Sequence, residues 1–274
     1  MLSLRSRDEE ATHLAMGTKL VLMVEYAGTR YHGFQFQINA PTIQGELEVA
    51  LRKLTGEDRR VMAASRTDAG VHAKGQIVSF RTRSGLPPQT FVRALNHYLP
   101  RDIAVKAAYR AGEGFNVRGD AVSREYRYYI ASGPSRSPFT RGFAYFVPRE
   151  LDVEKMKRAC QVLVGEHDFA SFVTSMGDEV KGTVRNVYRA GVERRGNMVI
   201  FDMVANSFLP HQIRNTVGAL IQVGMAKMGV EEFWHMARAK TPGLARPTSP
   251  ACGLCLMRVN YAVPLGGGDE NLQH

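Results

Sequence analysis

The chain has 274 residues, a formal net charge of +10 and 44% hydrophobic residues. This length suits one large globular domain or two modest ones with a substantial core, and no apolar run reaches the roughly 18 residues that a membrane span requires. The positive charge favours a polyanionic partner, because bound phosphates release counterions, although a basic balance can also serve solubility alone.

The first half of the chain has the pattern β-α-β-β-α-β. Apolar residues recur at helical spacing in two segments, the first beginning after Thr42, a suitable N-cap, and elsewhere they cluster or alternate as in strands. The predicted elements are a strand over 20–26, a helix that places Ile43, Leu47, Leu51 and Leu54 on one face, a short strand over 61–64, a strand over 76–82, a helix over 88–98 and a strand over 103–109.

The second half repeats this order. Alternation again predicts strands, and apolar residues spaced three and four apart predict helices. The predicted elements are a strand over 124–131, a helix with Val153, Met156, Cys160 and Leu163 on one face, a long loop over 166–181, strands over 184–193 and 198–205, helices over 212–228 and 230–239, and a last strand over 252–261.

Two such units in tandem predict an α+β fold of two ferredoxin-like halves. The halves would form a mixed or antiparallel sheet, with helices on one side and a cleft for nucleic acid on the other. A plain structural duplication gives the same pattern, so the fold alone assigns no function. We expect a flexible leader over 1–17, an N-terminal half over 18–112, a C-terminal half over 113–262 and a flexible tail over 263–274.

The cysteines Cys160, Cys252 and Cys255 cannot form a disulfide framework. Cys252 and Cys255 have the spacing of half a zinc site, but no second pair completes it, and the surrounding residues read as a strand. We therefore expect these cysteines to pack in a strand and the protein to bind no metal. A reduced, cytoplasmic protein is expected, since the leader lacks the apolar core of a signal peptide.

The densest polar cluster of the first half is the loop over 65–72, between two predicted strands. Loops held by strands commonly carry functional residues. Asp68 would lie close to the backbone, and the small residues after it leave room for a ligand, while Arg66 and His72 could contact phosphates. The alternative is a turn aspartate that bonds its own backbone.

Two candidates lie in the second half. Arg214 is at the margin of an otherwise apolar helix, where an arginine either pairs with a buried carboxylate or extends to water. Tyr126 lies on a strand between Arg124 and Arg127, and basic residues interleaved with aromatic ones are typical of nucleic-acid surfaces. Packing in the core is the alternative for the aromatic residues.

Several stretches together resemble the tRNA pseudouridine synthase A family, over about residues 18–262. Arg66-Thr67-Asp68-Ala69-Gly70-Val71-His72, followed by Gly75-Gln76, resembles the catalytic motif of that family. The other matching stretches are Glu25-Tyr26-Ala27-Gly28-Thr29, Tyr31-His32-Gly33-Phe34-Gln35, Thr42-Ile43-Gln44-Gly45-Glu46-Leu47-Glu48, Leu95-Asn96-His97-Tyr98-Leu99-Pro100, Arg124-Glu125-Tyr126-Arg127-Tyr128, Gly165-Glu166-His167-Asp168-Phe169, Phe208-Leu209-Pro210-His211-Gln212-Ile213-Arg214-Asn215 and Pro250-Ala251-Cys252-Gly253-Leu254.

The resemblance implies an isomerase that converts uridine to pseudouridine in tRNA, with no cofactor and no metal. It implies that Asp68 is the nucleophile and Arg214 its salt-bridge partner. Tyr126 would stack on the target base and could remove the C5 proton, and Leu254 would pack beneath the aspartate. Cys252 departs from the small or polar residues usual before the Gly-Leu pair, which has no bearing on catalysis. The family acts on the anticodon stem-loop, at tRNA positions 38 to 40, and works as a homodimer.

Two other functions fit parts of the sequence. A double ferredoxin-like binding protein would hold RNA through the same surface without chemistry, but it has no use for a buried charged pair such as Asp68 and Arg214. A metal-dependent nuclease needs several carboxylates at one site. Glu25 and Asp168 are candidates beside Asp68, but only Asp68 lies within a strong motif.

Overall fold

The computed structural model describes residues 17–174 and 182–266, which form two compact units. Unit 1 comprises residues 17–69, 73–122 and 259–266, and unit 2 comprises residues 70–72, 123–174 and 182–258. Most of the predicted leader and tail, residues 1–16 and 267–274, lies outside the described residues. The half boundaries expected from the sequence stay predictions.

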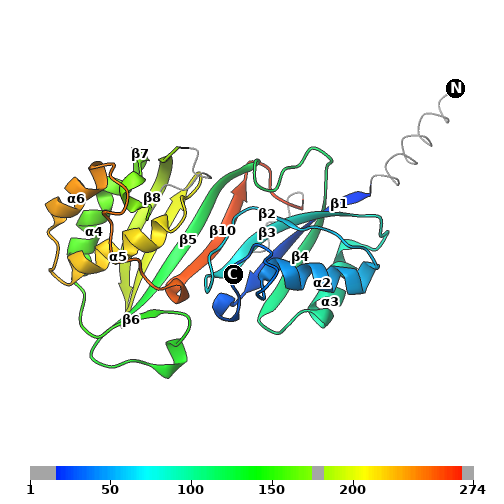
Figure 1. Ribbon diagram of the computed structural model, residues 1–274, viewed down its shortest axis with the longest axis horizontal. Coiled ribbons are helices and arrows are strands. Elements are labelled where there is room, and N and C mark those ends of the chain that lie inside the picture. Colours follow the sequence, from blue (N-terminus) through cyan, green and yellow to red (C-terminus); the bar gives the residue numbers. More distant parts are fainter. Residues whose placement is uncertain (1–16, 175–181, 267–274) are drawn as a thin grey trace. The chain divides into compact units, whose positions relative to one another are not determined.

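Unit 1 has the strand order β4-β1-β3-β2, and each neighbouring pair is antiparallel (Figure 1). In chain order this is fourth, first, third, second, the arrangement of a ferredoxin-like half. The helices α2 and α3 contact each other, and α3 packs against β4. The elements are β1 (Thr18–Tyr26), α2 (Ile43–Thr55), β2 (Met62–Ala63), β3 (His72–Thr82), α3 (Pro88–Tyr98) and β4 (Ile103–Ala111).

The ends of α2 follow from local chemistry. Thr42 is the N-cap, as predicted, and its Oγ1 accepts a hydrogen bond from the backbone N of Gly45 at 3.2 Å. The helix ends at Gly56, which has a left-handed φ of 73°. Leu47 and Leu51 on its inner face are fully buried.

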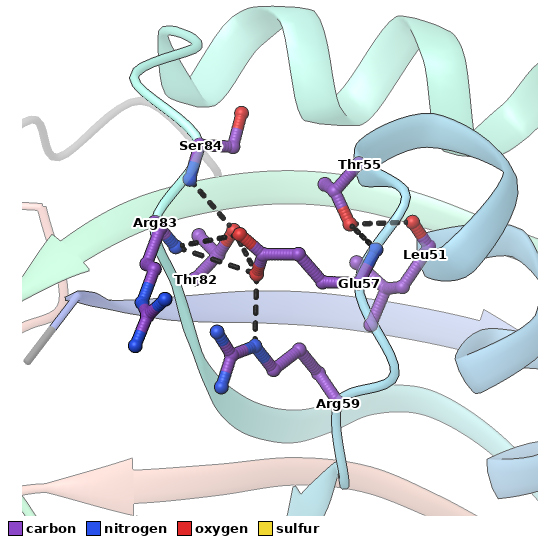
Figure 2. Close-up of polar contacts among 7 residues, drawn as sticks. All are labelled: Leu51, Thr55, Glu57, Arg59, Thr82, Arg83 and Ser84. Carbon is purple, nitrogen blue, oxygen red and sulfur yellow. Dashed lines mark hydrogen bonds and ion pairs between the residues drawn. The ribbon is translucent and has the colours of Figure 1, made fainter.

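Glu57, just after α2, joins this helix to the end of β3 (Figure 2). Its carboxylate accepts hydrogen bonds from Arg59 Nε at 2.8 Å, from Thr82 Oγ1 at 3.0 Å and from the backbone N of Arg83 at 3.0 Å. Burial raises the pKa of Glu57, but these hydrogen bonds outweigh it and the net shift is downward. The ionised carboxylate therefore fastens the helix layer of unit 1 to its sheet.

Unit 2 has the strand order β10-β5-β9-β8-β7. When the short strand β6 and the edge strand β7 are left out, this is again fourth, first, third, second. β6 pairs with β5 in parallel, whereas β5 with β9, β9 with β8 and β8 with β7 are antiparallel, so the strands form a mixed sheet. The elements are β5 (Ala121–Ser132), β6 (Tyr145–Val147), α4 (Val153–Cys160), β7 (Gly165–Asp168), β8 (Val184–Arg195), β9 (Met198–Ala205), α5 (Gln212–Gly224), α6 (Val230–Arg238) and β10 (Leu254–Tyr261).

The helices of unit 2 form one layer, since α4, α5 and α6 contact one another and α4 packs on β8 (Figure 1). The predicted α+β fold of two ferredoxin-like halves is confirmed, while the cleft stays a prediction. None of the described helices is long and apolar enough to cross a membrane.

Several predicted elements differ from the structure in their bounds or their type. The helix expected over 212–228 ends at Gly224, because Ala226 takes a left-handed φ of 56° and turns the chain. The segment expected to be a loop begins with β7, which pairs with β8, and its residues 175–181 lie outside the described residues. As an edge strand β7 exposes polar side chains, and that composition resembles a loop.

Candidate active site

Asp68 lies in the loop between β2 and β3, and it is half-buried. The buried side chains of unit 1 hold the loop just before it. Thr67 Oγ1 lies 2.7 Å from Tyr26 Oη on β1. Gln76 on β3 donates from Nε2 to Ser65 O at 2.7 Å, and its Oε1 accepts from Ser65 N at 3.3 Å. Two neighbouring strands therefore fix the backbone that leads into Asp68.

Gly33 supports the same loop from another side. Its φ is +91°, and a Cβ at this position would lie 2.8 Å from Thr67 O and 3.3 Å from Ala69 N. The backbone N of Phe34 donates to Thr67 O at 3.0 Å. The close backbone approach requires glycine here, so the Asp68 loop is clamped without any side chain between the two segments.

His72, in unit 2, ends the motif and is only 5% exposed. Its Nε2 lies 3.2 Å from Cys252 O, and its ring stacks on Phe143 with centroids 4.8 Å apart. Burial lowers the pKa of His72, and hydrogen bonds to the backbone of Gly142 and Cys252 oppose this only in part. The predicted contact of His72 with a phosphate stays a prediction.

Arg214 is half-buried in the first turn of α5, and the segment 247–253, here called the strap, holds it. Arg214 Nε donates to Ser249 O at 2.8 Å, and Ser249 N donates to Arg214 O at 3.1 Å. A Cβ at Gly218 would lie 1.6 Å from Pro247 O, so only glycine lets the strap lie this close to the helix. The guanidinium thus has a fixed orientation.

The strap also holds other side chains of unit 2 through its backbone. Tyr128 Oη donates to Pro250 O at 2.7 Å, and Cys252 O is the partner of His72. A Cβ at Gly253 would lie 2.5 Å from the ring of Tyr128. Burial raises the pKa of Tyr128, which therefore stays a hydrogen-bond donor. Leu254, directly after the strap, is buried.

Strand β5 presents its candidates on two opposite faces. Tyr126 is 5% exposed, and its ring meets Phe208 edge-on with centroids 5.2 Å apart. Arg124 is on the same face, is buried, and donates from a terminal nitrogen to Asn206 O at 2.8 Å. Arg127 is half-buried on the other face. The two arginines therefore do not flank Tyr126 on one surface.

The described residues divide the predicted site between the units. Asp68 and the exposed Arg66 belong to unit 1, whereas the other candidates belong to unit 2. The pairing of Asp68 with Arg214 stays a prediction. The sequence did not predict that certain buried side chains and glycines hold the loop and the strap. For Tyr26 and Gln76, the sequence feature that could have revealed this role is a polar group within an apolar strand, because a buried polar group requires a partner. The residues missed in this way are Tyr26, Gly33, Thr67, Gln76, Gly218 and Ser249.

The other carboxylates considered for a nuclease have structural roles. Glu25 forms an ion pair with Lys106 at 3.2 Å, and Asp168 Oδ1 accepts from the backbone N of Ala170 at 3.0 Å. Among the described residues, no group of three or more His, Cys, Asp or Glu side chains is placed to hold a metal ion. Neither Cys252 nor Cys255 is in a disulfide, and Cys252 lies in the 3-10 turn Ala251–Gly253 before β10 rather than in the predicted strand.

Comparison with known proteins gives a consistent result. A family model described as tRNA pseudouridine synthase matches residues 22–118 and 159–262. A tRNA pseudouridine synthase A from Roseiflexus castenholzii is 45% identical over 246 residues, which cover 88% of this chain and 90% of that protein. Proteins of the same name from Moorella thermoacetica and Neisseria gonorrhoeae are 41% and 39% identical, over 88% and 90% of this chain and 99% and 93% of their own lengths.

Proposed function

Since the chain belongs to the tRNA pseudouridine synthase family, isomerases that act on tRNA, we propose that it forms pseudouridine in the anticodon stem-loop, at tRNA positions 38 to 40, with Asp68 as the nucleophile. The loop of Asp68 carries this proposal. Two buried side chains and a close glycine hold its backbone, while the carboxylate itself is only half-buried. A nucleophile requires this combination of a fixed position and access to substrate.

The chemistry needs one carboxylate and no external reagent. A carboxylate oxygen of Asp68 adds to ribose C1′ or to uracil C6, and the N-glycosidic bond breaks with its electron pair on uracil. The uracil turns and its C5 bonds to C1′. On the C1′ route this step displaces the carboxylate of Asp68 from C1′, and on the C6 route the bond between Asp68 and C6 breaks afterwards. C5 loses a proton and N1 gains one. The product is an isomer of the substrate, so no atom or electron is gained or lost.

In the proposed reaction, Arg214 and Tyr126 assist Asp68. An arginine beside Asp68 favours the ionised form of the carboxylate and offsets the cost of its desolvation. The strap supports this role because it orients the guanidinium through Ser249. Tyr126 would stack on the uracil that leaves the RNA helix and take the C5 proton, and Leu254 would pack beneath Asp68.

We further propose that the enzyme works in the cytoplasm as a homodimer. The free cysteines fit a reducing compartment. The homodimer is implied by the family resemblance, and light scattering at working concentration should therefore give twice the chain mass. A mass of one chain, with full turnover, would contradict the dimer.

The substitution Asp68→Asn tests the nucleophile. Asparagine has nearly the same size and can still form hydrogen bonds, but it cannot add as an anion. Affinity for tRNA should stay within about tenfold of wild type, which is about 1.4 kcal/mol or less. Pseudouridine, measured by mass spectrometry of digested tRNA, should be undetectable, and no adduct should form with RNA that carries 5-fluorouridine at the target.

Asp58→Asn is a matched control, because Asp58 is exposed and forms only an exposed ion pair with Arg52 at 3.4 Å. This variant should keep wild-type turnover. Clear turnover by the Asp68 variant would remove Asp68 from the mechanism and leave an RNA-binding protein or another nucleophile as the explanation.

A further inference from the structure

The loop over 133–144, between β5 and β6, carries the most exposed aromatic side chain of the described residues. Phe139 is 94% exposed at its tip, and Phe143 is 55% exposed near its end. Figure 1 shows this loop in green, extending beyond the ends of β5 and β6. An apolar ring held in water in this way is a candidate contact for a partner.

The loop is built to hold this ring in place. At its base, Ser132 pairs with Val147 in the parallel β5–β6 ladder, and Ser132 Oγ donates to Arg149 O at 2.9 Å. At its tip, Pro138–Thr140 form a turn of 3-10 helix whose N-cap, Ser137, accepts from the backbone N of Phe139 at 3.3 Å. These contacts fix the backbone that carries the ring, so less conformational entropy is lost when the loop binds.

The positive charge near Phe139 in the chain indicates which class of partner the loop binds. No Asp or Glu occurs between Glu125 and Glu150, and the exposed Arg136 and Arg141 lie on either side of Phe139 in the chain. An exposed ring with arginines next to it matches an unpaired base and its phosphates. A second copy of the chain is a poorer match at this loop, because two such loops in contact would bring four exposed arginines together.

The root of the loop lies beside the catalytic motif. Phe143 stacks on His72, the last residue of the stretch that contains Asp68. We propose that Phe139 is a stacking platform for an unpaired base of the RNA substrate, with Arg136 and Arg141 on the neighbouring phosphates. The proposal rests on the RNA substrate of the proposed function. Phe139 positions the RNA and takes no part in the chemistry.

The test compares Phe139→Ala, Phe139→Leu and Phe139→Trp in the full chain. Affinities are measured by fluorescence anisotropy for a pre-folded hairpin RNA with an unpaired loop and for a fully paired duplex. Loss of one stacked base should weaken hairpin binding roughly tenfold in the Ala and Leu variants. The Trp variant should bind like wild type, and duplex binding should not change. Val263→Ala, at another exposed apolar side chain, should leave both affinities unchanged.

A second readout detects stacking directly. With 2-aminopurine in the hairpin loop, wild type and Phe139→Trp should quench its fluorescence on binding, whereas Phe139→Leu should not. Hairpin affinities equal to wild type in all three variants would overturn the platform. A smaller mass of Phe139→Ala in light scattering, with hairpin affinity unchanged, would overturn it too and assign the loop to self-association.

Failure of the proposed function is a separate result. These affinities do not depend on turnover. If the wild-type protein forms no pseudouridine but Phe139→Ala still weakens hairpin binding, the proposed function fails and the platform stands. If wild type is active and the variants bind as it does, only the platform fails.

Discussion

Arg214 is bonded to Ser249 both through its backbone carbonyl and through Nε. A lysine would keep the charge, but it lacks the Nε donor and the planar fork that meets a carboxylate at two points. Arg214→Lys should therefore lower single-turnover pseudouridine formation by about a hundredfold, with tRNA affinity within about tenfold of wild type. Arg238→Lys, at an exposed arginine of α6, is the control and should be fully active. Turnover near wild type would limit Arg214 to bonding the strap.

Tyr126 offers a test that separates its ring from its hydroxyl. Tyr126→Phe keeps the edge-on contact with Phe208 and removes only the oxygen. We expect binding to persist and turnover to fall by at least about a hundredfold, the usual contribution of a positioned acid or base. Tyr129→Phe, on the opposite face of β5, should change neither quantity. If Tyr126→Phe stays active, the residue only stacks and another group takes the proton.

For single residues, the sequence identified candidate site residues but not the hydrogen bonds that hold them in position. The motif around Asp68 stands out as a polar loop between strands. The bonds from Tyr26 and Gln76 depend on the register of β1 with β3, in which Val24 lies opposite Gln76 and a bulge follows. A register of this kind is a property of two strands distant in the chain, and local periodicity does not determine it.

Among the elements, α5 and the strap depend on each other through Gly218. Gly218→Ala would improve helix propensity by about 1 kcal/mol, but its Cβ would overlap Pro247 O and must displace the strap. Overpacking typically costs about 1–3 kcal/mol, so urea unfolding should show a net loss of stability. Turnover should fall as well, because Ser249 would move away from Arg214.

Gly112→Ala is the control for that substitution. A Cβ at Gly112 meets nothing within 4 Å. This variant should match wild type in both stability and turnover. A Gly218→Ala protein that is stable and fully active would show that the strap can shift without consequence for the site.

Element boundaries could be predicted where a single local cause determines them. The helix over 88–98 was predicted at its observed bounds, with a proline in its first turn. The strand β3 begins at His72, whereas the prediction began at residue 76. The prediction began too late because the first residues of β3, which include Gly75, do not alternate between apolar and polar as a half-buried strand does. The edge strand β7 was missed because pairing with β8, rather than its own composition, makes it a strand.

For the whole molecule, the tandem pattern and the charge were both visible in the sequence. The order of predicted strands and helices implied two ferredoxin-like halves, and both units have that strand order. The expected cleft could not be predicted in the same way from the order of strands and helices. It depends on side chains from both units, and a pattern of elements does not specify where such side chains meet.

The net charge of +10 predicts a strong dependence of tRNA binding on salt. Several phosphate contacts each release counterions, so affinity should fall by orders of magnitude between roughly 50 and 200 mM salt. Titrations with labelled tRNA at four salt concentrations would give the slope. A flat response would rule out a mainly electrostatic RNA surface, whatever the fate of Asp68.

The strap has a consequence for how this sequence can change over generations. It holds Arg214, Tyr128 and His72 through the carbonyl oxygens of Ser249, Pro250 and Cys252, which every amino acid possesses. Substitutions at these three positions can leave the carbonyl bonds in place, whereas Thr248 bonds through its side chain, with Oγ1 donating to Asn215 Oδ1 at 2.6 Å. The glycines are the exception, because at Gly218 and Gly253 any side chain would collide with a neighbour. Selection on the strap should therefore preserve the course of its backbone rather than the identity of the side chains at positions 249, 250 and 252.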